Sequence, residues 1–95
     1  MIITIHREMT ITHDDFFRIL PYALNEFAFE IHDNKVLCQA GSGQIEIELS
    51  LVKTKNLGAL KLPVMHVKFV LDNVKDEIKN RFFEKFDLAF QKGGG

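Results

Sequence analysis

The sequence has few of the residues that mark secreted scaffolds and membrane proteins. It contains no tryptophan, one tyrosine, two prolines and one cysteine among its 95 residues. Cys38 has no second cysteine for an internal disulfide, which is typical of a protein from a reducing compartment. No apolar stretch approaches the roughly 18 residues of a membrane span, and charged residues interrupt the N-terminal segment where a signal peptide is apolar. We therefore expect a cytoplasmic protein that does not associate with membranes.

An excess of charge of either sign is also lacking. Twelve basic residues stand against thirteen acidic ones, so the formal net charge is -1 and no overall field attracts nucleic-acid phosphates. We accordingly expect no nucleic-acid partner. The chain is 46% hydrophobic and contains nine phenylalanines, which is the composition of an ordered protein with a sizeable core. These totals predict a single domain over residues 1–92, followed by a flexible glycine tail at 93–95.

The periodicity of apolar residues predicts an α+β fold. Strict alternation indicates half-buried strands, and apolar residues at i, i+3 and i+4 indicate amphipathic helices. Strands are predicted at 2–7, 27–31, 36–40, 45–51 and 65–71, and helices from Thr12 onward and over 74–91. Pro21 lies inside the first helix and predicts a kink or an early end; residues 56–60 are predicted to form a loop. The order β-α-β-β-β-β-α predicts two layers, a single antiparallel sheet with both helices on one face.

Two resemblances accompany this prediction. The element order resembles one repeat of the TATA-binding-protein-like fold, a likeness of topology that carries no function. The C-terminal string from Phe86 to Gly95, FDLAFQKGGG, together with Leu60-Lys61-Leu62-Pro63, resembles a small family of uncharacterised bacterial proteins that end in FDxxFQ(K/R)GGG. The second resemblance implies a free-standing bacterial protein. It brings no activity, cofactor or catalytic residue with it.

The predicted open face of the sheet contains the residues that best suit a chemical site. His6 and His66 approach each other if the first and last strands are neighbours, and Glu46 and Glu48 then lie on a strand alongside. Histidine and carboxylate together bind divalent metals or carry out acid–base chemistry. The same mixture of charges also suits a sheet face that is simply solvated. No HExxH, CxxC or nucleophile motif is present, so no catalytic residue or cofactor is assigned.

A second group of residues indicates contact with another molecule. Phe83 and Leu88 widen the apolar stripe of the last helix beyond what one sheet requires, and exposed sheet edges offer a further route to pairing. A protein partner and a homodimer both satisfy these features. Gly93, Gly94 and Gly95 suggest either a frayed helix end or a carrier-type C-terminus.

The function that these features favour is a small, non-catalytic protein- or ligand-binding module of a bacterial cytoplasm. Two alternatives stay open. One is a metal-binding protein or enzyme that uses the histidines and glutamates of the open face. The other is a carrier that acts through its C-terminal glycines.

Overall fold

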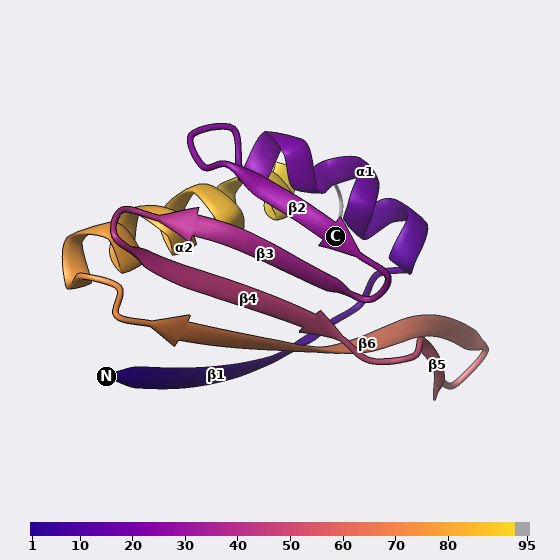
Figure 1. The fold of residues 1–95 in the computed structure, drawn as a ribbon. Coiled ribbons are helices and arrows are strands. Elements are labelled where there is room, and N and C mark those ends of the chain that lie inside the picture. The colour runs from indigo at the N-terminus through magenta and orange to yellow at the C-terminus, as the bar shows by residue number, and fades with distance from the viewer. Residues whose placement is uncertain (93–95) are drawn as a thin grey trace.

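Alternating apolar and polar residues form an antiparallel sheet in the computed structural model, which describes residues 1–92 (Figure 1). The predicted α+β class and the two-layer order are confirmed, with one additional strand, β5, that pairs with a long last strand. The elements are β1 (Ile2–Met9), α1 (His13–Ala23), β2 (Phe29–His32), β3 (Lys35–Ala40), β4 (Gly43–Leu49), β5 (Lys53–Leu57), β6 (Leu60–Asp72) and α2 (Asp76–Lys92).

The order of strands across the sheet is β1-β6-β4-β3-β2, and every pairing is antiparallel. The first and last strands are therefore neighbours. This is the condition under which His6 and His66 were predicted to approach each other. Both helices cover the same face of the sheet, and the opposite face is open (Figure 1). The alternation along β4 shows the two faces, because Ile45, Ile47 and Leu49 are buried and the residues between them are partly exposed.

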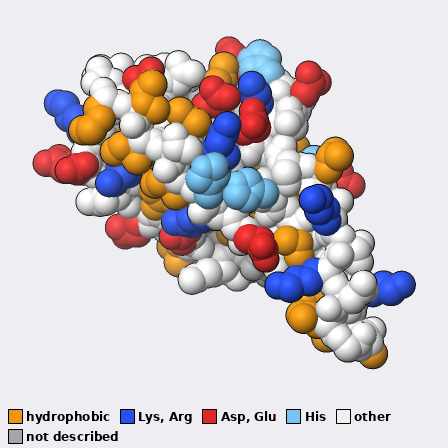
Figure 2. Space-filling model, turned by 90° about the horizontal axis from the view of Figure 1, so that it is seen from below, with side chains coloured by type: hydrophobic (Ala, Val, Ile, Leu, Met, Phe, Trp, Pro, Cys, Tyr) orange, Lys and Arg blue, Asp and Glu red, His pale blue; other side chains and the backbone are white. Residues whose placement is uncertain are grey.

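Strand β6 extends well beyond the body of the sheet. Its C-terminal half pairs with β1 and β4, whereas its N-terminal half, Leu60 to Val64, pairs with β5. The segment from 51 to 64 therefore forms a hairpin, which we call the arm. The molecule measures 47 × 24 × 23 Å, and the arm forms one end of its long axis (Figure 2).

A bulge separates the arm from the body. Leu49 is opposite Val67 and Lys53 is opposite Val64, so Ser50, Leu51 and Val52 face only two residues of β6. An extra residue on one strand reverses which side chains point to which face. The prediction that Leu51 continues the buried alternation of β4 is thus wrong, since Leu51 is 81% exposed.

The predicted loop at 56–60 is a tight connection between β5 and β6. Only Gly58 and Ala59 lie between the two strands, and Gly58 has a φ of 60°. Glycine adopts that left-handed conformation without steric cost, which suits a short hairpin turn. Ordered strands therefore flank a turn where an irregular loop was expected.

The first helix begins and ends where its sequence signals predict. The Thr12 side chain accepts a hydrogen bond of 3.2 Å from the backbone N–H of Asp15, which satisfies one free donor of the first turn. Pro21 lies on the exposed side, and the helix ends two residues later at Ala23. The early end follows because proline removes a backbone donor and crowds the preceding turn.

Phenylalanine rings fill the space between the sheet and the helices. Phe69 of β6 lies 5.3 Å, between ring centroids, from Phe86 of α2, which in turn lies 4.5 Å from Phe90. Phe16 of α1 stacks on Phe90 at 5.0 Å, so the rings connect all three elements. Each such pair contributes about 0.5–1.5 kcal/mol beyond the burial of its surface. Among residues 1–92 no polar or charged residue is buried, so this core is entirely apolar.

Gly43 marks a close approach between β4 and the end of β6, and it provides a test of this packing. A Cβ at Gly43 would lie 2.3 Å from the carbonyl oxygen of Asn73, a backbone atom that has no rotamer to change. We expect Gly43→Ala to lower the free energy of unfolding by about 1–3 kcal/mol, the usual cost of overpacking. Denaturant titration measures this. Ser42→Ala, in the exposed turn beside it, is the control and should change stability by less than about 0.5 kcal/mol. Equal stability of the two variants would show that the strands separate freely at this point.

Candidate functional site

The open face of the sheet has a row of polar side chains that crosses all five strands of the body. Strand register places His6 opposite Lys68, Lys68 opposite Glu48, Glu48 opposite Lys35, and Lys35 opposite His32. Side chains directly opposite each other in an antiparallel pair lie on the same face and within contact distance. The row is consequently a continuous polar surface, and Figure 2 shows histidines side by side within it.

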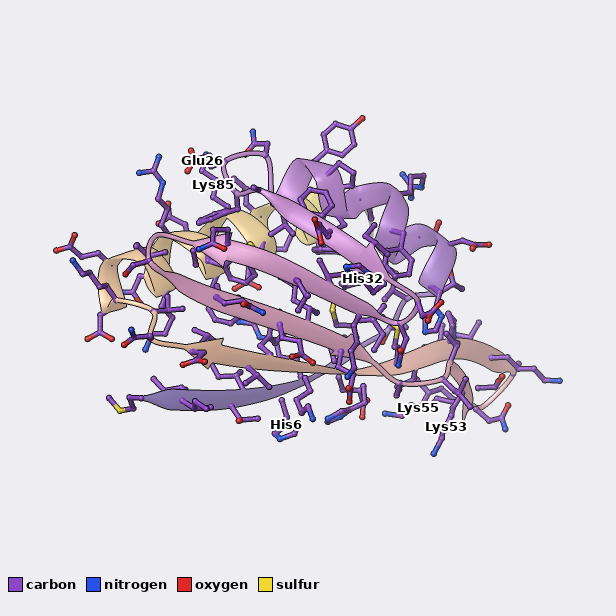
Figure 3. All side chains as sticks on the ribbon, viewed as in Figure 1. His6, Glu26, His32, Lys53, Lys55 and Lys85 are labelled. Atoms are coloured by element: carbon purple, nitrogen blue, oxygen red, sulfur yellow. The ribbon has the colours of Figure 1, made fainter. Side chains whose placement is uncertain are left out.

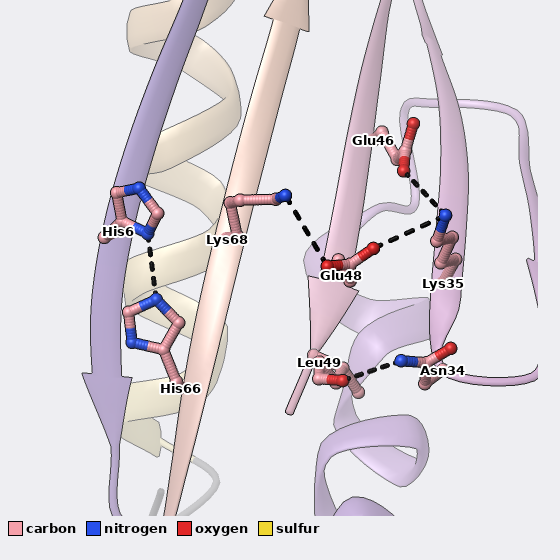
Figure 4. Close-up of polar contacts among 8 residues, drawn as sticks. All are labelled: His6, Asn34, Lys35, Glu46, Glu48, Leu49, His66 and Lys68. Carbon is pink, nitrogen blue, oxygen red and sulfur yellow. Dashed lines mark hydrogen bonds and ion pairs between the residues drawn. The ribbon is translucent and has the colours of Figure 1, made fainter. Parts of the chain in front are cut away.

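His6 and His66 meet, as the sequence analysis predicted for neighbouring strands. The His6 Nδ1 atom lies 2.8 Å from His66 Nε2, and the ring centroids are 5.0 Å apart (Figure 4). One nitrogen must donate and the other accept, so the contact requires at least one unprotonated ring with a suitable tautomer. Both rings are exposed, and they therefore offer nitrogen atoms to solvent or to a bound ion.

Glu46 and Glu48 are held by lysines. Lys35 Nζ lies 3.4 Å from a Glu48 oxygen and 3.6 Å from a Glu46 oxygen, and Lys68 Nζ reaches Glu48 at 3.5 Å (Figure 4). The hydrogen bond from Lys35, and then the charge of Lys68, lower the pKa of Glu48 below its ordinary value. The bond with Glu48, and then the charge of Glu46, raise the pKa of Lys35. Glu48 is therefore ionised and balanced by lysine at neutral pH, and Glu46 lies within ion-pair distance of the same Lys35.

The four predicted site residues form two separate groups. The histidines contact each other, while the glutamates contact lysines. Within residues 1–92, no three histidine, cysteine or acidic side chains are grouped so that they could hold a metal ion. A site that uses all four residues together is not assembled in this structure. What the geometry offers is a histidine pair beside a lysine–glutamate network.

The predicted interaction residues of α2 differ in exposure. Phe83 is half-buried against Phe69, at 5.0 Å between ring centroids, and the Arg7 guanidinium lies 4.7 Å from its ring centre. Arg7 also forms an ion pair with Asp87, which fixes it over the ring. Leu88, by contrast, is 50% exposed. Of Phe83 and Leu88, only Leu88 is exposed enough to contact another molecule through its apolar side chain. Gly93, Gly94 and Gly95 lie outside the described residues.

Arg81 and Lys85 of α2 are already paired within the protein. Glu26 accepts hydrogen bonds from Arg81 at 2.6 and 2.9 Å and lies 3.0 Å from Lys85 (Figure 3). The Arg81 hydrogen bond, and then that of Lys85, lower the pKa of Glu26 to about 2. On this flank, Arg81 and Lys85 therefore share the single carboxylate of Glu26.

The arm is the surface that the sequence analysis did not identify. Every residue from 51 to 61 is exposed, including four large apolar side chains: Leu51 at 81%, Val52 at 38%, Leu57 at 50% and Leu60 at 62%. Figure 2 shows the arm as a narrow projection with hydrophobic and basic side chains. The sequence signal was the Leu-Gly-Ala-Leu turn between two segments that contain lysine but no acid.

A shallow recess lies at the other end of the open face, over β2, β3 and β4. Its volume is about 470 Å³, and Leu37, Gln39 and Gln44 contribute to its lining. The Gln39 amide is already used, since its nitrogen donates to the carbonyl oxygens of Gly41 and Gly43 at 3.2 Å. The lining mixes apolar and polar side chains, since Phe29 and Glu30 of β2 also contribute to it.

No protein-family model and no curated protein matches this chain. Within residues 1–92, neither α1 nor α2 has the length and apolar character that crossing a bilayer requires. The fold and the site therefore define the protein by class alone: a two-layer α+β protein with an open polar sheet face and a projecting apolar arm.

Cys38 is the sole thiol, and its environment makes it unreactive. The side chain is buried on the core face of β3, and desolvation raises its pKa to about 12. Because the thiolate is the nucleophile, the native thiol should react with a disulfide reagent at mildly alkaline pH only after the protein unfolds. Release of the coloured leaving group with and without denaturant measures this. Cys38→Ala combined with Ser42→Cys, which places a thiol in an exposed turn, should react in the native state. Equal native rates for the two proteins would contradict the burial.

Proposed function

We propose that this protein is a non-catalytic interaction module of a bacterial cytoplasm that binds another protein chain through its arm. The observation that carries the proposal is the concentration of exposed apolar side chains on one projecting element. Exposed apolar residues scattered singly are normal, but a contiguous group on a soluble protein is typical of a binding surface. Pairing between β5 and β6 holds the backbone of Leu57 and Leu60 in place, so little backbone conformational entropy is lost there when a partner binds.

Photocrosslinking in living bacterial cells tests this function. We expect a photoreactive phenylalanine analogue at position 60, at the arm's tip, to form discrete crosslinked products with a partner protein. The matched control is position 22 of α1, where Tyr22 is 75% exposed but stands apart from the arm, and it should give few products. The purified partner should then bind the wild-type protein, and Leu57→Ser with Leu60→Ser should weaken that binding at least about tenfold. Crosslinks of equal yield from both positions would contradict binding through the arm.

The same experiment separates the alternatives for the partner. A homodimer predicts a crosslinked product of twice the chain's mass that also forms with the purified protein alone. Docking through the α2 flank predicts products from position 88 instead, since Leu88 is also exposed. A carrier role predicts products that depend on the residues 93–95.

A second candidate function is binding of a transition-metal ion by the histidine pair. The 2.8 Å between His6 Nδ1 and His66 Nε2 is the observation that favours it. Two imidazole nitrogens bound side by side to one metal at about 2.0–2.1 Å lie about 2.9 Å apart in square-planar or octahedral geometry. The pair is therefore spaced to supply two ligands, and solvent would supply the others.

Titration with copper, nickel and zinc distinguishes a metal site from a simple hydrogen bond. We expect amide resonances at His6 and His66 to shift or broaden locally in an isotope-labelled protein. His6→Ala should abolish the change, because a single imidazole binds these ions far more weakly. His32→Ala is the control, since His32 is also exposed but contacts Glu30, at 3.1 Å, and no other histidine. Unchanged spectra at a large excess of each metal would remove this candidate.

A further inference from the structure

The arm has a charge pattern that the rest of the protein does not share. Between residues 51 and 64 the sequence contains Lys53, Lys55 and Lys61 and no acidic residue. Lys55 lies 3.8 Å from Glu8 of β1. Neither Lys53 nor Lys61 takes part in an ion pair with any residue in the described part of the chain. The arm is therefore locally cationic on a protein whose overall charge is almost balanced.

Strand register determines which face of the arm each of these lysines occupies. Lys53 lies opposite Val64, Lys55 opposite Leu62, and Leu57 opposite Leu60. Opposed residues share a face, so one face of the arm combines two lysines with an apolar row. Lys61 is opposite Asn56 and belongs to the other face. Lys53 and Lys55, the two lysines of the apolar face, are labelled in Figure 3.

Strand β5 also has an unpaired edge. Among the described strands it pairs with β6 alone, and all five of its residues are exposed. A free edge presents backbone N–H and C=O groups that can bind an extended segment as an additional strand. Residues of that segment that are opposite Lys53, Lys55 and Leu57 would lie on the face that bears the lysines.

We propose that the arm binds an acidic, partly apolar segment of a partner protein by strand addition to β5. The proposal rests on the proposed function and specifies its partner. Opposite β5, the segment places carboxylates beside Lys53 and Lys55 and an apolar side chain beside Leu57. A segment that runs parallel to β5 therefore has the pattern acidic-x-acidic-x-apolar. A segment that runs antiparallel to β5 has the pattern apolar-x-acidic-x-acidic.

The same charges disfavour other occupants of the edge. In a symmetric pairing of two copies centred on Lys55, that lysine would lie opposite itself, and like charges directly opposite destabilise a strand pair. Nucleic acid is disfavoured because the arm has no aromatic side chain for base stacking. In addition, the carboxylates of Glu8 and Glu48 lie on the adjoining face, where they would repel the phosphates of a nucleic acid.

Selection from a random displayed peptide library tests the proposal with the whole protein. We expect enriched sequences to combine Asp or Glu at alternate positions with Leu, Ile, Val or Phe two residues after or before them, according to the direction of the segment. Binding of a selected synthetic peptide should weaken as salt rises, because the lysines are exposed and screened. Lys53→Glu with Lys55→Glu should weaken binding by about tenfold or more, and a peptide with its acids changed to lysine should restore it.

The matched control is Lys61→Glu, which changes charge on the opposite face of the same arm and should weaken binding by no more than about twofold. On binding, amides of Lys53 to Leu57 should gain protection from hydrogen exchange, which a contact made only by side chains would not produce.

The remaining outcomes separate this proposal from the function on which it rests. Enriched peptides without acidic residues that still require Leu57 and Leu60 would overturn the acidic pattern and leave binding through the arm intact. The absence of any enriched peptide, together with no partner crosslinks from position 60, would overturn both. Tighter binding to oligothymidylate or to phosphatidylserine vesicles than to any peptide would replace the protein partner with a polyanion or a membrane surface.

Discussion

Pairing along the whole length of β6 is the constraint on which the rest of the structure depends. The strand has 13 residues, and it pairs with β1, β4 and β5. Its C-terminal half contributes Met65, Val67, Phe69 and Leu71 to the core, all of them buried. The helices pack on that surface through the phenylalanine rings, so a shift of β6 by one residue would expose the core row and bury the polar one. The arm is the continuation of this same strand beyond the cover of the helices.

Charge is distributed differently over the body and the arm. On the body, Lys35 and Lys68 balance Glu46 and Glu48, and Arg81 and Lys85 are both paired with Glu26. Exposed pairs of this kind add little to stability because solvent screens them, but their charges are already engaged within the protein. Lysines on the arm lack such partners apart from the contact of Lys55 with Glu8. The free charge and the free apolar surface thus occur on the same element.

Lysine on an exposed strand also limits what that strand can pair with. An edge strand that is flat, long and apolar risks aggregation with copies of itself, and charged side chains reduce that risk. On β5 the lysines repel a second β5 and any basic strand, but they favour an acidic one. Protection against self-association and selection of a partner can therefore arise from the same side chains.

The sequence predicted the fold and the candidate site to different extents. The alternation in β4 and β6, the Thr12 cap and the spacing of the α2 phenylalanines are local signals, and each predicted its element correctly. The meeting of His6 with His66 was predicted only on condition that β1 and β6 are neighbours. The arm was not predicted, because Ser50 to Asn56 shows no clear alternation and the bulge reverses the faces on either side of it.

The sequence by itself determined the elements of the body, the α+β class and the apolar residues of the core, because these follow from the periodicity of neighbouring residues. Only the tertiary structure decided which polar side chains meet. Strand order placed a lysine, and not a histidine, beside Glu46 and Glu48. It also decided that Leu57 and Leu60 project into solvent, since their register places them on the face of the arm that continues the open face of the sheet. Contacts between strands distant in sequence depend on strand order and register, and no local pattern encodes either of them.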